Sequence, residues 1–196
     1  MSYYHRSIFV GIMLGDASIR KIKLLNNNPR IIFKQSFINF PYFWYVFMEL
    51  YPYCASLPKL VITKIGLKKY YLMVLATRNY FFLNELYDIF IINGKKCVPD
   101  EIYHEWTPVA LAHWIMCDGS WTHSGLTLCT DSFTLKDVVI LMNVLLIKYN
   151  ISSNLHKAAG LPRIYIGSKE ISKLRIIVNE CIISFFSYKL GYRSIK

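Results

Sequence analysis

Two aspartates stand at the ends of two apolar stretches, one in each half of the chain. Residues 9–15 (FVGIMLG) lead to Asp16, and residues 110–117 (ALAHWIMC) lead to Asp118. If both stretches are helices, each carboxylate meets the negative end of a helix dipole, which typically costs about 0.3–1 kcal/mol. Two such carboxylates side by side also repel each other unless a cation shares the site. One such helix alone would be read as a core helix with cap residues, but the pair predicts a cation-binding site.

The residues around the aspartates indicate which cation this would be. Oxygen ligands without a nearby Cys/His cluster favour Mg²⁺ or a similar hard ion. The backbone carbonyls of Gly15 and Cys117, freed at the helix ends, are expected supplementary ligands. Cys117 has no basic neighbour in the sequence, so we expect a packing thiol and not a nucleophile. His113 and Trp114 lie in the middle of the second stretch and are expected to pack at an interface, not to bind metal.

Local signals support helices in both places. Thr107 can cap the second helix, Pro108 suits its first turn, and Gly119 is expected to supply a left-handed residue after its end. In the first stretch, Gly11 and Gly15 lie four residues apart on one face. Two small residues at that spacing allow another helix to approach closely, so we expect the two apolar helices to pack side by side.

The chain contains two versions of one unit. Besides the two aspartates, residues 35–37 (QSF) resemble 131–133 (DSF), and residues 83–96 resemble 176–189. Both of the longer segments end in a lysine, Lys96 in the first and Lys189 in the second. Similarity that repeats at a steady spacing indicates a duplicated structural unit.

Hydrophobic spacing and turn residues give the order of elements within each unit. The first half is expected to hold a helix that ends at the aspartate, strands 18–23 and 30–35, helix 37–51, strands 59–65 and 70–77, and helix 80–91. The second half is expected to hold helix 108–117, strand 126–130, helix 134–149, strands 153–157 and 163–167, and helix 169–184. We predict an α+β fold of two αββαββα units, with helices packed on one face of each of two antiparallel sheets. The expected boundaries are 1–97 and 107–196, with a linker at 98–106.

The charge of the chain indicates a polyanionic partner. The formal net charge is +11 and the pI is about 9.4. Residues 17–84 contain ten Lys and Arg against one acid, Glu49, whereas Asp100, Glu101 and Glu105 gather between the two apolar stretches. This distribution favours a nucleic-acid-binding face with an acidic connector at its back. The alternative is charge that serves only solubility.

Other classes of protein fit the sequence less well. The richest apolar run, residues 138–147, is interrupted by Asn143 and is too short to span a bilayer. The N-terminus does not resemble a secretory signal, and the basic residues lie in strand-like stretches instead of an amphipathic helix. Five scattered cysteines without a C-x-x-C pair indicate neither disulfides nor zinc. We expect a soluble protein of a reducing compartment.

Two motifs resemble a known family. FVGIMLGDA and LAHWIMCDG are similar to the paired motifs of single-chain LAGLIDADG homing endonucleases, with greatest similarity to the yeast mitochondrial omega-intron type. The segments INGKKCVPDEI and IYIGS…SYKLG are similar to that branch too. Ala17 replaces a glycine of the idealised motif and Cys117 replaces its small residue. Neither replacement touches the carboxylates.

The resemblance implies a pseudo-symmetric monomer that binds double-stranded DNA and cuts both strands. The motif helices would form the interface, and each half would present a saddle-shaped sheet to the major groove. Asp16 and Asp118 match metal-binding carboxylates over the minor groove, which would hold Mg²⁺ or Mn²⁺, with Ca²⁺ as a non-catalytic substitute. Lys96 and Lys189 match basic residues near the scissile phosphates. An intron-encoded protein of the mitochondrion is implied, the chloroplast being less favoured, and the abundance of Ile, Asn, Lys, Tyr and Phe agrees with an AT-rich organellar gene.

Alternate residues of the expected strands are candidates for contact with DNA. The candidates in the first half are Ser18, Arg20, Arg30, Ile32, Lys34, Lys64, Lys68, Tyr70 and Arg78. The candidates in the second half are Thr122, His123, Thr127, Thr130, His156, Lys157, Arg163 and Tyr165. Two other functions stay open: an RNA-binding maturase that helps its own intron fold, and a transcription regulator, which would have lost the metal ligands.

Overall fold

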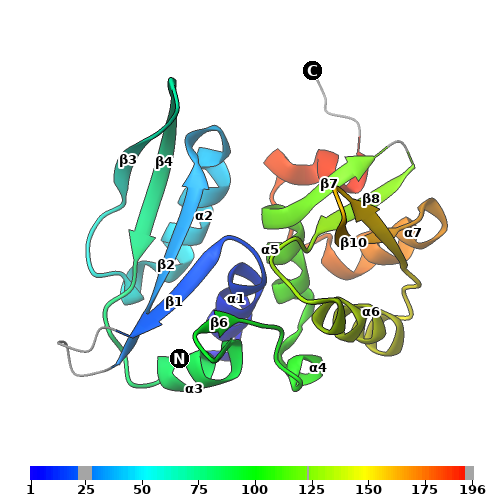
Figure 1. Ribbon diagram of the computed structural model, residues 1–196, viewed down its shortest axis with the longest axis horizontal. Helices are drawn as coiled ribbons and strands as arrows, with labels where there is room; N and C mark the ends of the chain where they lie inside the picture. The colour runs from blue at the N-terminus through cyan, green and yellow to red at the C-terminus, as the bar shows by residue number, and fades with distance from the viewer. Residues whose placement is uncertain (22–27, 123, 193–196) are drawn as a thin grey trace.

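The two helices that lead to the aspartates pack against each other at the centre of the molecule (Figure 1). The computed structural model describes residues 1–21, 28–122 and 124–192, and in it these helices are α1 (Tyr3–Leu14) and α5 (Pro108–Asp118). A Cβ added to Gly11 would lie 2.5 Å from the carbonyl oxygen of Ala110. Only glycine therefore allows this close approach, and the predicted close packing of the two helices is confirmed.

In the first half, a four-stranded antiparallel sheet follows α1, with strand order β1-β2-β4-β3. Its strands are β1 (Ala17–Lys21), β2 (Pro29–Ser36), β3 (Lys59–Ile65) and β4 (Lys68–Ala76). Helices α2 (Phe40–Leu50) and α3 (Leu83–Phe90) pack on one face, and the short 3-10 turns η1 (Phe37–Asn39) and η2 (Tyr51–Tyr53) flank α2. Burial alternates along β2, which gives the sheet one covered and one open face.

The second half repeats this arrangement around α5, with strand order β7-β8-β10-β9. The strands are β7 (Gly119–Thr122), β8 (Gly125–Cys129), β9 (Asn154–Ala158) and β10 (Leu161–Ile166). Helices α6 (Leu135–Tyr149) and α7 (Ser168–Val178) cover one face, and the 3-10 segment η3 (Ser184–Leu190) follows. A reciprocal capping box of Thr134 and Asp137 begins α6, and left-handed Asn150 ends it.

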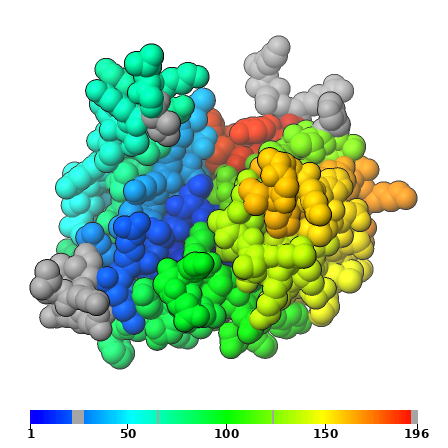
Figure 2. All heavy atoms as spheres, in the orientation of Figure 1, coloured from blue at the N-terminus to red at the C-terminus, as the bar shows by residue number. Residues whose placement is uncertain are grey.

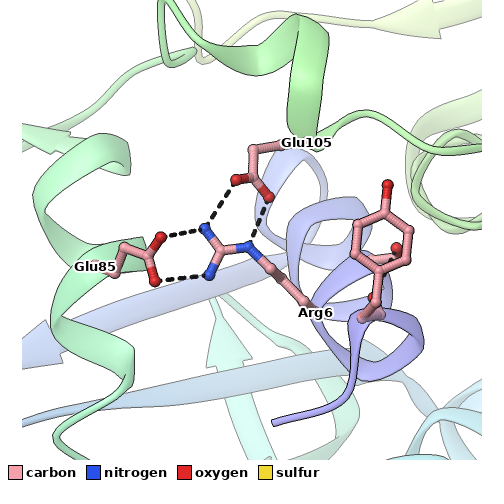
Figure 3. Close-up of polar contacts among 5 residues, drawn as sticks. Arg6, Glu85 and Glu105 are labelled. Atoms are coloured by element: carbon pink, nitrogen blue, oxygen red, sulfur yellow. Dashed lines mark hydrogen bonds and ion pairs between the residues drawn. The ribbon is translucent and has the colours of Figure 1, made fainter.

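A short connector joins the halves and is tied to the first helix. The hairpin of β5 (Ile91–Ile92) and β6 (Lys95–Lys96) ends the first half, and the connector after it contains the single turn α4 (Ile102–Glu105). Arg6 of α1 pairs with Glu105 through Nε at 2.7 Å and with Glu85 of α3 through Nη2 at 2.9 Å (Figure 3). The planar guanidinium serves two carboxylates at once, so one side chain fixes α1, α3 and α4 relative to each other.

The predicted α+β class and duplicated order are confirmed, with three differences. A strand, β7, follows Asp118 directly; the predicted αββαββα order requires it, but the predicted ranges of the second half did not include it. The predicted helix 169–184 ends at Val178, and the chain then continues to the separate segment η3. Gly119 is extended (φ −75°, ψ 141°), so the predicted left-handed cap is wrong. A Cβ there would lie 2.5 Å from the carbonyl oxygen of Ile115, which makes close packing the reason for this glycine.

The core runs through both halves and includes almost all of α1 and α5. Along α1 every side chain from Ser7 to Leu14 is buried, and along α5 every side chain from Ala110 to Met116. In the described part of the chain, the helices all fall short of the length and apolarity needed to cross a membrane. The central position of α1 and α5 means that their C-terminal ends emerge together between the two sheets (Figure 1).

Candidate active site

The two aspartates come together where α1 and α5 end. Asp16 follows α1 and Asp118 is the last residue of α5. Asp118 Oδ2 lies 3.5 Å from the position that a Cβ on Gly15 would take. By solvent accessibility Asp16 is exposed and Asp118 is half-buried, so water and ions can reach both carboxyl groups. The predicted juxtaposition is therefore present.

Both carboxyl groups are shifted toward the protonated form. Desolvation by the surrounding protein raises the pKa of Asp16 and raises that of Asp118 to about 7. The charge of Asp16 raises the pKa of Asp118 further, whereas Lys96 and Lys189 oppose the shift. Two carboxylates that raise each other's cost of ionisation form a site that gains from a bound cation.

Two lysines reach the same helix ends from equivalent places in the two halves. Lys96 of β6 donates to the carbonyl oxygen of Gly15 at 2.7 Å. Lys189 of η3 donates to the carbonyl oxygen of Met116 at 2.5 Å and makes a longer contact of 3.4 Å with that of Cys117. Lysines in these positions satisfy carbonyls that have no partner inside the helix. Desolvation lowers the pKa of both ammonium groups, and the two aspartates oppose this.

These lysines already occupy the two backbone carbonyl groups that were predicted to bind metal. The Gly15 oxygen already accepts from Lys96, and the Cys117 oxygen already accepts from Lys189. A carbonyl oxygen has two lone pairs, so each could accept a second interaction. Their role as metal ligands stays a prediction.

Gln35, on β2, is a site residue that sequence reasoning missed. Its side-chain amide donates to Asp16 Oδ2, and its Oε1 accepts from Asn39 at 2.9 Å. Gln35 is buried on the helix-covered face. The sequence signal was a polar residue two positions after Phe33 and four after Ile31, which puts it on the same buried face of the strand. A buried polar group is more informative than an exposed one.

The second half has no counterpart of this amide. Strand pairing aligns Ala17 with Phe33 and Gly119 with Leu128, so the position equivalent to Gln35 is Thr130. The sequence alignment of Gln35 with Asp131 was therefore wrong by one residue. The hydroxyl of Thr130 donates to the carbonyl oxygen of Pro162 at 2.5 Å.

The side chains beneath the aspartates are packed and neutral. Tyr42 Oη lies 3.0 Å from His113 Nδ1 and 3.4 Å from Cys117 Sγ. Burial lowers the pKa of His113 to about 3 and raises that of the Cys117 thiol well above its usual range. A protonated thiol is a poor nucleophile, so the geometry agrees with packing roles for both residues.

The donor set suits a metal that keeps water and phosphate ligands. In the described residues no cluster of three or more His, Cys, Asp and Glu could hold a metal ion, which leaves Asp16 and Asp118 as the acidic donors. Mg²⁺ is commonly bound through one or two carboxylates together with substrate phosphates and water. The residues present therefore fit such an ion better than they fit an all-protein metal cage.

The open faces of the two sheets carry most of the residues predicted to contact DNA. Strand register and burial place the following candidates there: Ser18, Arg20, Arg30, Ile32, Lys34, Lys68, Tyr70, Thr122, Thr127, His156, Arg163 and Tyr165. Their placement agrees with contact across an open face, and the contact with DNA itself stays a prediction.

Four candidates lie elsewhere, and a fifth, His123, is outside the described residues. Lys64 pairs with Lys69 and therefore faces away from Lys68 and Tyr70, because the turn at 66–67 sets Ile65 opposite Lys68. The prediction that these three share a face is wrong for Lys64.

In the second sheet Lys157 neighbours His156 along β9 and so faces the other way, and Thr130 is buried on the covered face. The grouping of Lys157 and Thr130 with the open face is therefore wrong as well. Arg78 lies beyond the end of β4, beside Tyr51 and Pro52.

The open face of the second sheet is less free to bind anions than that of the first. Arg163 is paired with Asp131 at 2.8 Å, and His156 stacks on Tyr165 with ring centroids 4.5 Å apart. In the part of the chain that the structure describes, Arg20 and Lys34 on the first sheet form no ion pair with an acidic side chain. The halves are thus alike in fold and unlike in charge.

Comparison with known proteins agrees with this geometry. Residues 6–174 match the model of the LAGLIDADG DNA endonuclease family. The chain is 36% identical to cytochrome b mRNA maturase bI2 of Debaryomyces hansenii over 190 residues, which is 92% of this chain and 71% of that protein. It is 35% identical over 199 residues to the maturase of the same name from Saccharomyces cerevisiae, covering 94% of this chain and 47% of that protein.

Solved structures show the same fold. The homing endonuclease I-WcaI bound to its DNA recognition sequence is 28% identical, with a TM-score of 0.90 over 98% of this chain and 88% of that one. The structure of I-DmoI in complex with DNA and Mn is 18% identical, with a TM-score of 0.52 over 90% of this chain and 97% of that one. The latter likeness shows the fold alone.

Proposed function

Because this chain belongs to the LAGLIDADG DNA endonuclease family, we propose that it is a metal-dependent, site-specific endonuclease that hydrolyses both strands of a long DNA target. The observation that carries the proposal is the meeting of Asp16 and Asp118 at two helix ends, flanked by Lys96 and Lys189. Two core helices could pack without carboxylates at their ends. The free-energy cost of placing two acids there is accounted for if the site binds a cation and a phosphate group.

Asp16 and Asp118 would hold the divalent ion, Mg²⁺ or Mn²⁺, with Ca²⁺ as a non-catalytic substitute. When bound, such an ion supplies charge neutralisation at the phosphate under attack and lowers the pKa of a water molecule. The Mn-containing complex of I-DmoI supports divalent metal use on this fold.

The other residues of the site have supporting roles. The amide of Gln35 fixes the orientation of the Asp16 carboxylate. The ammonium groups of Lys96 and Lys189 lie where the two helices end, and there they would hold phosphate oxygens on the two strands. Because each half supplies one aspartate and one lysine, each half would serve one strand, which gives a double-strand break.

The open faces of the two sheets would bind the major groove on either side of the site. One sheet covers about one helical turn, roughly 10 bp, and basic residues contact mainly phosphate while polar ones read base edges. The β3–β4 hairpin projects from the first half (Figures 1 and 2), and it carries Lys59, Lys64, Lys68 and Lys69. Since the two open faces differ in charge, the target would be asymmetric, with a monomer as the binding unit.

A maturase is the second candidate because two relatives carry that name. The same basic surface would then bind structured intron RNA, and the aspartates would be dispensable. Their names also support an organellar gene, and we propose the mitochondrion as the site of action.

The decisive experiment is selection of cleaved sites from a randomised duplex library, with Mg²⁺ and with EDTA. An endonuclease yields one long, asymmetric consensus only with metal, and the double variant Asp16→Asn/Asp118→Asn yields none. The intron RNA that surrounds the gene is tested in parallel for splicing with the wild type and the double variant. Splicing support by both proteins, with no cleaved consensus from the wild type, would establish the maturase instead.

A further inference from the structure

Trp114 of α5 buries a polar group that its own packing does not explain. The side chain has no exposed surface, and its indole Nε1 has no hydrogen-bond partner in the described part of the chain. A buried donor without an acceptor typically costs about 1–3 kcal/mol. The residues around the ring leave this N–H group without an acceptor, so its presence calls for an explanation.

A candidate acceptor is the carboxylate of Asp118. Trp114 precedes Asp118 by four residues on the same helix, so both side chains lie on one face. Helical side chains lean toward the N-terminus, which directs the carboxylate back over the indole. The two side chains stand one helical turn apart, and the indole Nε1 has no hydrogen-bond partner among the described residues. The terminal torsion of Asp is soft, so a small rotation of the carboxyl group would complete the bond.

The two halves differ at this point. Asp16 receives the amide of Gln35 from the sheet, whereas the equivalent Thr130 is engaged with Pro162. In α1 the residue four positions before Asp16 is Ile12, which has no donor. Among the described residues, Asp16 therefore has a side-chain donor in Gln35, whereas the candidate donor for Asp118 is Trp114 on its own helix.

We propose that Trp114 is a positioning residue whose indole N–H holds the Asp118 carboxylate in its working orientation, in the place that Gln35 takes for Asp16. The consequence for strand cleavage rests on the proposed endonuclease function, but the contact itself does not. Removal of the N–H should therefore affect the strand that depends on Asp118 and spare the strand that depends on Asp16.

Trp106 provides a matched control. It is also fully buried with an unpartnered Nε1, and its ring packs edge-on against Trp114 with centroids 5.3 Å apart. It precedes α5, more than two helical turns from Asp118. Trp106→Phe and Trp114→Phe thus remove the same atoms from adjoining buried rings, and only the second removes a donor from beside a carboxylate.

The first test needs neither metal nor DNA. In protein with ¹⁵N-labelled tryptophan, the four indole N–H resonances are recorded by NMR, and the two Phe variants assign Trp106 and Trp114. We expect Asp118→Ala to shift the Trp114 resonance and to leave that of Trp106 in place. An unchanged Trp114 resonance, or equal shifts of both, would overturn the proposal.

The second test follows the two strands separately. With a duplex target labelled differently on each strand, Trp114→Phe should slow cleavage of one strand by about tenfold, as is typical when a supporting contact is lost, so that nicked DNA accumulates. Gln35→Met should slow the other strand, and Trp106→Phe should change both rates by less than about twofold. Equal slowing of both strands by Trp114→Phe would mean a merely structural role. If the wild type cuts no DNA while the NMR shift is present, the proposed function fails and the contact stands.

Discussion

At the scale of single residues, the site places two acids where folding alone would not. Asp16 and Asp118 meet the negative ends of two helices and each other, and Lys96 and Lys189 offset part of that cost. Natural sequences depart from such local rules mainly at functional sites. The role of the two aspartates can be measured as cleavage activity, and their cost to folding as stability.

Removal of either carboxylate should separate cleavage from binding. Asp16→Asn and Asp118→Asn keep size and polarity but remove one negative charge from the site. We expect each variant to lose double-strand cleavage by at least 100-fold, because metal binding is lost, with DNA affinity within about threefold of the wild type. Plasmid linearisation and gel-shift titration measure the two quantities. Full linearisation by either variant in Mg²⁺ would remove that residue from the mechanism.

The raised pKa of Asp118 predicts how stability depends on pH in metal-free protein. Its pKa is about 7 when folded and about 4 when unfolded. Between these values the folded state retains a proton that the unfolded state releases, so this group's contribution to stability decreases as pH rises from about 4 to 7. Asp118→Asn removes the effect, and the variant should gain Tm relative to the wild type at pH 8 more than at pH 5.

Thermal melts at the two pH values in EDTA check this directly. The control variant Thr122→Ser, at an exposed position, should have the same difference in Tm from the wild type at both pH values. Mg²⁺ at pH 8 should then stabilise the wild type more than Asp118→Asn. A gain in Tm by the Asn variant that is equal at both pH values would contradict the shifted pKa.

At the scale of elements, the contact between α1 and α5 positions the site. Gly11 lets α5 approach until a Cβ would meet the Ala110 carbonyl oxygen at 2.5 Å and the His113 Cβ at 2.6 Å. Both neighbours are parts of a buried helix and cannot swing aside. The contact between the helices therefore depends on the absence of a Cβ at residue 11. Through this contact, so does the distance between Asp16 and Asp118.

Gly11→Ala should therefore destabilise the fold despite the better helix propensity of alanine. We expect a loss of about 2 kcal/mol, within the usual 1–3 kcal/mol for overpacking. Gly167→Ala is the control, because its Cβ would meet only Tyr165 at an ordinary 3.8 Å and its φ is −73°. Urea denaturation gives both values. Similar stabilities for the two variants would show that the helices can separate at little cost.

At the scale of the whole molecule, charge is distributed between faces. Arg20, Arg30, Lys34 and Lys68 lie on the open face of the first sheet, while Glu105 of the connector and Glu85 of α3 pair with Arg6 near the start of α1 (Figure 3). Contacts with phosphate release counterions, which makes affinity fall with salt.

DNA affinity should consequently fall steeply with salt, in proportion to the number of phosphates contacted. Lys34→Gln should reduce the slope of log K against log salt by about 0.9, the value for one phosphate contact. Lys169→Gln, at the exposed start of α7 on the helix-covered side, should leave the slope unchanged. Fluorescence anisotropy between 50 and 300 mM salt, on the order of the range used for such slopes, checks both. A flat response would contradict binding through the open faces.

Local patterns in the sequence were enough to predict the α+β class, the duplication and the paired aspartates. Apolar periodicity fixes which stretches become helices or strands, Thr107 and Pro108 mark the start of α5, and a charged residue after an apolar run is visible without coordinates. These features depend on neighbours in the chain, and so they can be read from it.

The tertiary structure alone decided what depends on contacts between distant residues. Gln35 reaches Asp16 only through the pairing of β1 with β2, Thr130 turns to Pro162 across the sheet, and the turn at 66–67 sets which face Lys64 takes. Strand register is set by these long-range pairings, and a shift of one residue moves a side chain to the opposite face. For that reason the sequence identified the acids of the site, and only the packed structure identified the groups that hold them in place.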